Sequence, residues 1–281
     1  MAMARRFGGI AFTLVVRQRE KTLTHLRLAF ANEKSEEEIR GIAREVFENL
    51  AMTMAELLQF PKLSREKVEK LVDAGGAYEI YNRLLAEGNG LISVTAHIGN
   101  WELLAGIFGL RGHSGAVLAR RIYYEPYNRW IVGLRQSLKV PTIYRDDSSR
   151  DILKRLARNE IIGLLPDQDI DSLKGVFVPF FGRLAYTPVA PVRLAMTSGA
   201  PILPNFLVRQ KDGRYKLVAG QVLRVPDTMG LGREEASRKM TEDWMRQFEN
   251  VIRMYPGQWA WMHNRWRTQP SAKEGKETVA K

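Results

Sequence analysis

Short apolar runs alternate with helical patterns from residue 91 onward, and this alternation constrains the fold more than any other feature. The predicted strands cover residues 91–95, 115–119, 142–144, 161–165 and 202–208. The predicted helices between them cover residues 101–109, 127–138, 148–159 and 188–198. Strands separated by helices pair in parallel, and ligand sites lie at their carboxyl ends. The sequence therefore predicts an α/β fold with a central mixed, mostly parallel sheet flanked by helices.

The flanking segments complete a single predicted domain. Its parts are a helical N-terminal segment at 4–60, an α/β core at 91–225 and a C-terminal helix at 233–255, together forming a domain at 1–270. Ser35 and Glu38 form a predicted capping box at a helix start. Residues 215–225 are predicted to be an antiparallel edge hairpin. The polar, charged residues 271–281 predict a disordered tail.

The chain is strongly basic, with 43 Lys and Arg against 31 Asp and Glu and a net charge of +12. Such a surplus favours a nucleic acid, an anionic membrane surface or a phosphorylated substrate. No nucleic-acid partner is expected, because the sequence lacks an RNP-like strand, zinc-finger spacing and a basic recognition helix. The absence of cysteine excludes thiolate metal ligands and a cysteine nucleophile. The four histidines show no two-ligand spacing, so no metal site is expected.

The longest apolar run near the N-terminus is Ile10 to Val16, bracketed by basic residues. It is well short of the ~20 residues that span a bilayer. No small-residue cleavage site follows it, as a secretory signal would require. We therefore expect an interfacial or packing helix.

His97 has the sequence setting most suggestive of chemistry. It follows a buried strand, and Gly99 and Asn100 permit a tight turn and a side-chain helix cap before Glu102. On one helix, His97 and Glu102 would lie about 140° apart, but a strand–turn–helix junction can fold the carboxylate beneath the imidazole. A base oriented by an acid in this way can deprotonate a hydroxyl. The alternative is a structural His–Glu pair.

A second unusual segment follows the strand at 161–165. Asp167 and Asp169 can bind a metal, orient a cation or make an Asx-type turn, and the turn is the simplest interpretation. Residues 176–182 (VFVPFFG) are too apolar for a solvent-exposed loop. They are expected to pack under the sheet, or to line an aliphatic cavity or membrane-facing patch.

Several sequence blocks in order carry a family resemblance. They are residues 95–102 (TAHIGNWE), 165–169 (LPDQD), 176–182 (VFVPFFG), 200–204 (APILP) and 259–270 (WAWMHNRWRTQP). This set resembles the bacterial late lipid A acyltransferases, the lauroyl and myristoyl transferases, over roughly residues 5–270. It looks more distantly like the glycerolipid acyltransferases, which carry H-x4-D.

The resemblance implies O-acyl transfer from an acyl carrier protein thioester to a hydroxyl of a lipid A precursor, without a cofactor. His97 would be the general base, and Glu102 would hold its tautomer and stabilise the imidazolium. No acyl-enzyme is implied, and no serine stands in a nucleophile-elbow pattern. The implied partners are the acyl carrier protein, the lipid A precursor and the anionic surface of the inner membrane, at its cytoplasmic face.

The resemblance also implies substrate-binding residues: Asn100, Arg120, Arg135, Asp167 and Asp169. Either arginine would meet a substrate phosphate, with a solvated or structural arginine as the alternative. Asp167 would position an arginine or the substrate. The favoured expectation for His263 is packing beside Trp261 and Trp266, with a place in the site as the alternative.

The chain departs from the family pattern in two places. The family carries an N-terminal apolar anchor ahead of this segment, and Asn264 and Gln269 stand where arginine is usual. Two alternatives stay open: an acyltransferase for another glycolipid, such as a phosphatidylinositol mannoside, and a non-catalytic peripheral lipid-binding protein. The sequence leaves open the acyl chain length, the acceptor hydroxyl, and whether the donor is acyl carrier protein or coenzyme A.

Overall fold

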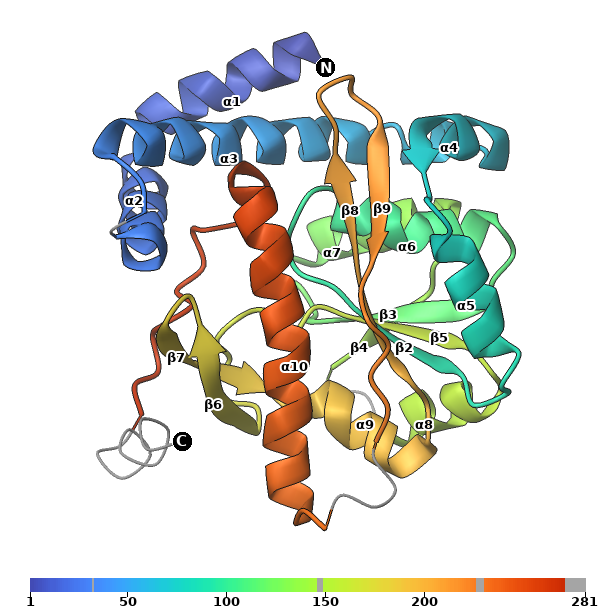
Figure 1. Cartoon of the computed structure of the whole chain (residues 1–281). Coiled ribbons are helices and arrows are strands. Elements are labelled where there is room, and N and C mark those ends of the chain that lie inside the picture. Colours follow the sequence, from blue (N-terminus) through green and yellow to red (C-terminus); the bar gives the residue numbers. More distant parts are fainter. Residues whose placement is uncertain (32, 146–148, 226–229, 271–281) are drawn as a thin grey trace.

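A seven-stranded sheet forms the centre of the computed structural model, which describes residues 1–31, 33–145, 149–225 and 230–270 (Figure 1). The strands are β1 Val72–Asp73, β2 Leu91–Val94, β3 Gly115–Ala119, β4 Thr142–Tyr144, β5 Ile161–Leu164, β8 Ile202–Arg209 and β9 Tyr215–Ala219, in the order β1-β9-β8-β2-β5-β3-β4. The block β8-β2-β5-β3-β4 is parallel, whereas β9 runs antiparallel to β8 and pairs in parallel with β1. The predicted mixed, mostly parallel sheet is confirmed.

Helices surround this sheet. They are α1 Ala2–Leu14, α2 Val16–Phe30, α3 Glu36–Leu57, α4 Arg65–Leu71, α5 Ala77–Leu85, α6 Trp101–Leu110, α7 Glu125–Ser137, α8 Ser149–Ala157, α9 Ala190–Ser198 and α10 Arg233–Met254, with short 3-10 turns at Phe60–Lys62 and Pro256–Gln258. The predicted capping box of Ser35 and Glu38 is present at the start of α3. The tail predicted at 271–281 lies outside the described residues.

The side chains of β2 show how the sheet separates two apolar layers. Ile92 and Val94 pack into one core with residues of α8, α9 and α10. Leu91 points to the opposite face, where α5, α6 and α7 form a second core. Because alternate residues of a strand face opposite sides, Ser93 and Thr95 also lie on the α6 side.

Two local expectations need correction. Residues 215–225 do pair antiparallel with β8, through β9 and a bridge between Leu223 and Ile202, but they do not form the edge of the sheet, because β1 covers β9. The apolar segment at 176–182 is not a loop either. It lies in a two-stranded hairpin, β6 Gly175–Phe180 and β7 Arg183–Pro188, whose buried side chains pack with α10 and the C-terminal tryptophans and belong to the same core as one face of the central sheet.

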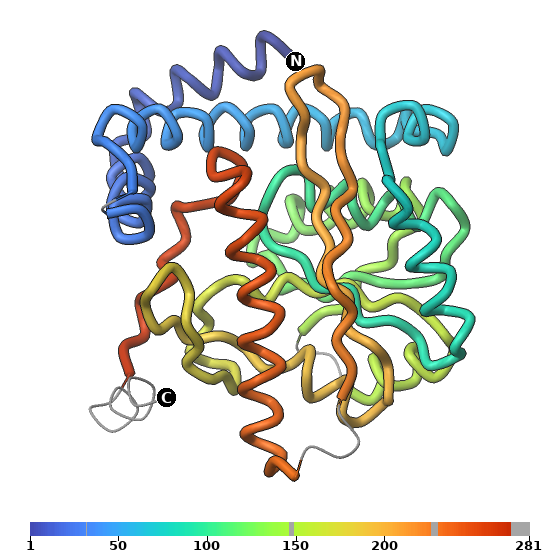
Figure 2. The backbone as a smooth tube through the Cα atoms, in the orientation of Figure 1, coloured from blue at the N-terminus to red at the C-terminus, as the bar shows by residue number. Residues whose placement is uncertain are grey.

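The segment after α10 returns across the molecule. Figure 2 shows it leaving α10 near α3 and running along the β6–β7 hairpin. Arg265, fully buried, fixes this path by donating to the Tyr186 carbonyl at 2.6 Å and to Thr187 Oγ1 at 2.5 Å. Residues near the C-terminus are therefore brought close to the carboxyl ends of the central strands.

Close packing of α1 on α3 depends on a glycine. A Cβ atom added at Gly8 would lie 2.5 Å from Glu48 Cα and 2.6 Å from the Phe47 carbonyl oxygen. Both are backbone atoms, so a side chain here would force the two helices apart.

We expect Gly8→Ala to lower the free energy of unfolding by about 1–3 kcal/mol through overpacking. Gly133→Ala is the matched control, because Gly133 lies in α7 with no atom within 4 Å of a built Cβ. That change should raise stability by up to about 1 kcal/mol through helix propensity. Urea unfolding of both variants checks the expectation, and equal effects would contradict the packing argument.

Candidate active site

Two neighbouring strand ends bring a histidine and a carboxylate together. β2 and β5 pair in register at Val94 and Leu164, and His97 and Asp167 follow three residues after each. The ring Nδ1 of His97 lies 2.7 Å from Asp167 Oδ1, and the backbone N–H of His97 donates to Asp167 Oδ2 at 2.8 Å. Asp167 is therefore tied to both the side chain and the backbone of His97.

A third donor to Asp167 comes from the C-terminal segment. Trp259 Nε1 donates to Asp167 Oδ2 at 2.9 Å. This segment also pairs with the loop after β2, because the Ala260 N–H donates to the His97 carbonyl at 3.0 Å. The Asp167 side chain is 1% exposed, and these three hydrogen bonds stabilise its ionised form.

The turn after His97 requires a glycine. Gly99 adopts φ +60°, and a Cβ built on it would lie 2.0 Å from the Leu207 carbonyl oxygen. The Gly99 carbonyl accepts from Thr53 Oγ1 at 3.1 Å, which ties the turn to α3.

Asn100 caps α6 and does not face a substrate. Its Oδ1 accepts from the Leu103 N–H at 2.9 Å, and its Nδ2 donates to Glu56 Oε2 at 2.7 Å. The side chain is fully buried. The predicted cap is confirmed, and both ends of the amide are bound within the fold, so the structure gives Asn100 a capping role in place of the expected contact with a substrate.

The charges of the pair depend on burial and on each other. Burial disfavours the imidazolium, but the Asp167 carboxylate outweighs it, so the pKa of His97 lies above its usual value. Burial would likewise raise the pKa of Asp167, yet the contacts with His97 and Trp259 hold that pKa well below its usual range. Asp167 therefore stays ionised and accepts a hydrogen bond from the Nδ1–H of His97, which leaves Nε2 of the neutral ring as the proton acceptor.

Glu102 does not hold the imidazole. Its two carboxylate oxygens accept from Arg135 Nε at 2.8 Å and Nη2 at 2.7 Å. Glu102 lies in the first turn of α6 and faces α7, whereas Nδ1 of His97 faces the end of β5. The expectation for Glu102 is corrected: Asp167 orients the ring, and Glu102 contributes only a more distant charge that raises the pKa of His97.

Two further residues border the ring of His97. The Gln168 amide nitrogen lies 3.3 Å from His97 Nε2 and 3.0 Å from His263 Nε2. The ring centroids of His97 and His263 are 5.2 Å apart. Burial, followed by the charge of His97, lowers the pKa of His263 to about 4, so it is neutral at pH 7. His263 therefore lies beside His97 and Gln168, in agreement with the alternative expected for it.

The other predicted residues have separate places. Asp169 accepts from the Thr268 N–H at 2.7 Å and from its hydroxyl at 2.8 Å, so it holds the C-terminal segment. Arg120 is exposed and has no hydrogen bond or ion pair with another residue that the structure describes. Arg120 and Arg135 both line the open cavity that contains His97, which also includes Arg145 and Arg267.

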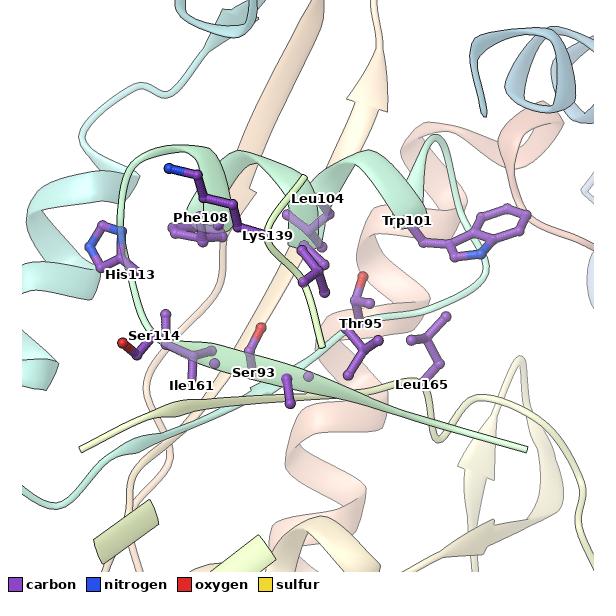
Figure 3. A pocket seen from close by; sticks show the side chains of 17 residues that line it. Ser93, Thr95, Trp101, Leu104, Phe108, His113, Ser114, Lys139, Ile161 and Leu165 are labelled. Atoms are coloured by element: carbon purple, nitrogen blue, oxygen red, sulfur yellow. The ribbon is translucent and has the colours of Figure 1, made fainter. Parts of the chain in front are cut away.

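A second cavity continues from the first. Trp101 and Leu165 lie in the walls of both. The second cavity runs between α6 and the sheet and is narrow, with about 50 Å³ of space inside it. Figure 3 shows Trp101, Thr95 and Leu165 near one end and His113 and Ser114 near the other. Apart from a few hydroxyls, His113 and Lys139, its walls are apolar.

Comparison with known proteins identifies the family. Residues 2–268 match the profile of a family described as "Bacterial lipid A biosynthesis acyltransferase". The chain belongs to this family. It is an acyltransferase, as the sequence blocks predicted.

Individual relatives are distant. The Escherichia coli lipid A biosynthesis lauroyltransferase is 26% identical over 265 residues, 94% of this chain and 83% of the relative. The palmitoleoyltransferase of the same organism is 26% identical over 273 residues, 94% of this chain and 84% of the relative. A Mycobacterium tuberculosis phosphatidylinositol mannoside acyltransferase is 28% identical over 156 residues, 53% of this chain and 49% of the relative.

We expect Asp167→Asn to lower the pKa of His97, because the acyltransferase loses the carboxylate that stabilises the imidazolium. Glu102→Gln is the matched control and should produce a smaller decrease, since its charge acts from a greater distance. Nuclear magnetic resonance titration of labelled histidine rings measures both. A decrease in Glu102→Gln that equals the one in Asp167→Asn would contradict the assignment of Asp167 as the partner.

Proposed function

We propose that the acyltransferase moves a fatty acyl chain from an acyl carrier protein thioester to a hydroxyl of a lipid A precursor, with His97 as general base. The observation that carries this proposal is the His97–Asp167 pair. Asp167 occupies Nδ1, which leaves Nε2 as a proton acceptor at the wall of a basic cavity. A base oriented by a buried carboxylate is suited to activate a hydroxyl.

The reaction requires no acyl-enzyme. His97 Nε2 takes the proton from the acceptor hydroxyl as its oxygen attacks the thioester carbonyl carbon. The C–S bond then breaks, and the imidazolium returns the proton to the leaving thiolate. Asp167 stays ionised throughout and stabilises the imidazolium, so the products are an ester and a free carrier thiol.

The apolar cavity beside the base supports an acyl donor. Along β5 its wall runs from Ile161 past Gly163 to Leu165, about 13 Å at roughly 3.3 Å per residue. An extended peptide has three bonds per residue and therefore advances about 1.2 Å per bond. An extended acyl chain advances by about the same amount, so the length of this wall corresponds to about 11 bonds. We therefore propose that the acyl chain of the donor lies along this wall.

The arginines of the open cavity support a phosphorylated acceptor. Glu102 neutralises Arg135, and Asp171 lies 2.9 Å from Arg267. Arg120, which has no such partner among the residues that the structure describes, is the residue we assign to a substrate phosphate. The net charge of +12 also suits an acidic carrier protein. The mycobacterial relative makes a mannoside glycolipid the second candidate acceptor.

Transfer assays test the proposal directly. We expect wild type to acylate a lipid A precursor from carrier protein thioesters, and His97→Ala to lose at least ~100-fold in rate. Donors with acyl chains of 8 to 18 carbons measure the chain-length preference, and matched coenzyme A thioesters measure the preference for the carrier. A mannoside acceptor assayed in parallel measures the acceptor preference. Equal rates in wild type and His97→Ala would refute the base assignment, and transfer only to the mannoside would refute the acceptor.

The pH profile provides a further check on the base. The reaction requires the unprotonated imidazole of His97, and the pKa of this ring is raised. As the pH decreases, kcat/KM should therefore fall around a pH that is higher than the pKa of free histidine. Asp167→Asn should move this acid limb to lower pH and reduce the plateau. If Asp167→Asn leaves the acid limb where it is, the limb reports the titration of a group other than His97.

An outward-facing stripe on α1 supports docking at a membrane. Gly8 and Gly9 are buried against α3 and Phe12 packs on Phe47, whereas the other large apolar residues of α1 face away from the protein. Met3, Phe7, Ile10 and Leu14 are 83%, 66%, 56% and 72% exposed and recur at helical spacing. Exposed arginines flank this stripe, as expected for a helix lying on anionic lipid.

Each helix in the described part of the chain is too short or too polar to cross a bilayer. We propose that α1 lies flat on the cytoplasmic face of the inner membrane, where carrier protein and lipid precursor meet.

We expect Phe7→Glu with Ile10→Glu to weaken binding to phosphatidylglycerol-containing vesicles by more than 10-fold, because each apolar side chain contributes about 1.5–3 kcal/mol when buried. Vesicle sedimentation at fixed salt measures this. The same charge change at Leu58 and Met254, which are exposed apolar residues outside α1, is the control and should leave binding unchanged. Undiminished binding by the α1 variant would exclude α1 as the docking face.

A further inference from the structure

The hydroxyl of Thr95 is buried without a hydrogen-bond partner. Its Oγ1 is enclosed, no partner lies within reach among the described residues, and the whole residue is 5% exposed. A buried hydroxyl in this condition costs about 1–3 kcal/mol of stability. Such a cost is unusual in a well-packed centre and points to a group that is bound there during function.

The neighbouring hydroxyl on the same strand is fully paired. Ser93 Oγ accepts from Asn205 Nδ2 at 2.7 Å and lies 3.1 Å from the Tyr81 hydroxyl. Ser93 and Thr95 lie two residues apart at the end of β2, and both line the apolar cavity on the side that faces α6. Of these two hydroxyls, only that of Thr95, two residues before the base, lacks a partner among the described residues.

Thr95 lies where the two cavities join. It lines the apolar cavity together with Trp101 and Leu165, and these two residues also line the open cavity that contains His97. In Figure 3 the three side chains gather at one end of the apolar cavity. The acyl chain of the thioester would lie in the apolar cavity, and its carbonyl carbon must be within reach of a hydroxyl activated by His97. Both conditions place the thioester carbonyl at this junction.

We propose that the Thr95 hydroxyl donates a hydrogen bond to the thioester carbonyl oxygen and stabilises the oxyanion that forms there. This inference rests on the proposed function. As the acceptor oxygen bonds to the carbonyl carbon, the C=O electron pair moves to the oxygen and the acceptor proton moves to His97. When the carbonyl re-forms, the C–S bond breaks and His97 returns the proton to sulfur. Thr95 keeps its own proton throughout and stabilises the oxyanion by hydrogen bonding alone.

The isosteric change Thr95→Val tests the hydroxyl alone. Loss of one oxyanion donor lowers kcat by about 100-fold or more, while KM for the donor stays within a few fold. The same change should hold or raise the melting temperature, because it removes an unpaired buried hydroxyl. Thr95→Ser keeps the donor and should retain kcat within about threefold. Thr197→Val, at an exposed position of α9, is the control and should leave kcat unchanged.

A spectroscopic readout needs no acceptor substrate. Dodecanoyl-pantetheine carrying a 13C=O label should show a lower carbonyl stretching frequency when bound to wild type or Thr95→Ser than when bound to Thr95→Val. The proposal is overturned if the frequency is the same in all three. It is also overturned if Thr95→Val keeps kcat, or if kcat and melting temperature fall together, since the hydroxyl would then be structural. Failure of wild type to acylate any acceptor, with the frequency shift intact, would instead count against the proposed function.

Discussion

The carboxylate of Asp167 connects the separate parts of the molecule on which the site depends. It is almost completely buried and receives hydrogen bonds from the His97 ring, the His97 backbone and the Trp259 indole. An ionised carboxylate is stable in such surroundings only when several donors face it at once. Removing any donor would therefore weaken both the local fold and the orientation of the base.

The order of the sheet makes this cluster possible. β2 lies between β8 and β5, so the loop after β2 has a neighbouring strand end on each side. On the β5 side it meets Asp167, and on the other side the Gly99 turn contacts the Leu207 backbone. Helix α6 begins directly after this turn and covers the apolar cavity, so one short segment sets both the base and the roof of that cavity.

Local sequence patterns were sufficient for much of the fold and insufficient for the site's pairings. Strand and helix positions in the core follow from periodicity, and the Ser35 and Asn100 caps follow from residue type. The partner of His97 depends on β2 and β5 being adjacent, which no spacing along the chain reveals. The only hint was that Asp167 also follows a strand end.

Other discrepancies have the same origin. Glu102 was assigned to His97 because it is near in sequence, but Arg135 on the next helix meets it first. Trp259, Gln168 and His263 stood within blocks that the family resemblance singled out, yet their contacts with the site require the return of the C-terminal segment. The two-residue strand β1 is too short to give any periodic signal.

The contribution of Trp259 has a consequence for the order of events during synthesis. A chain emerging from the ribosome N-terminus first can form β2, β5 and their pairing well before Trp259 is available. His97 and Asp167 would meet in that intermediate, but the third donor and the strand-like contact beside His97 would be missing. The catalytic geometry is thus completed only when α10 and the segment after it have been released and docked. A nascent chain already positioned near lipid would remain inactive until its folding is nearly finished.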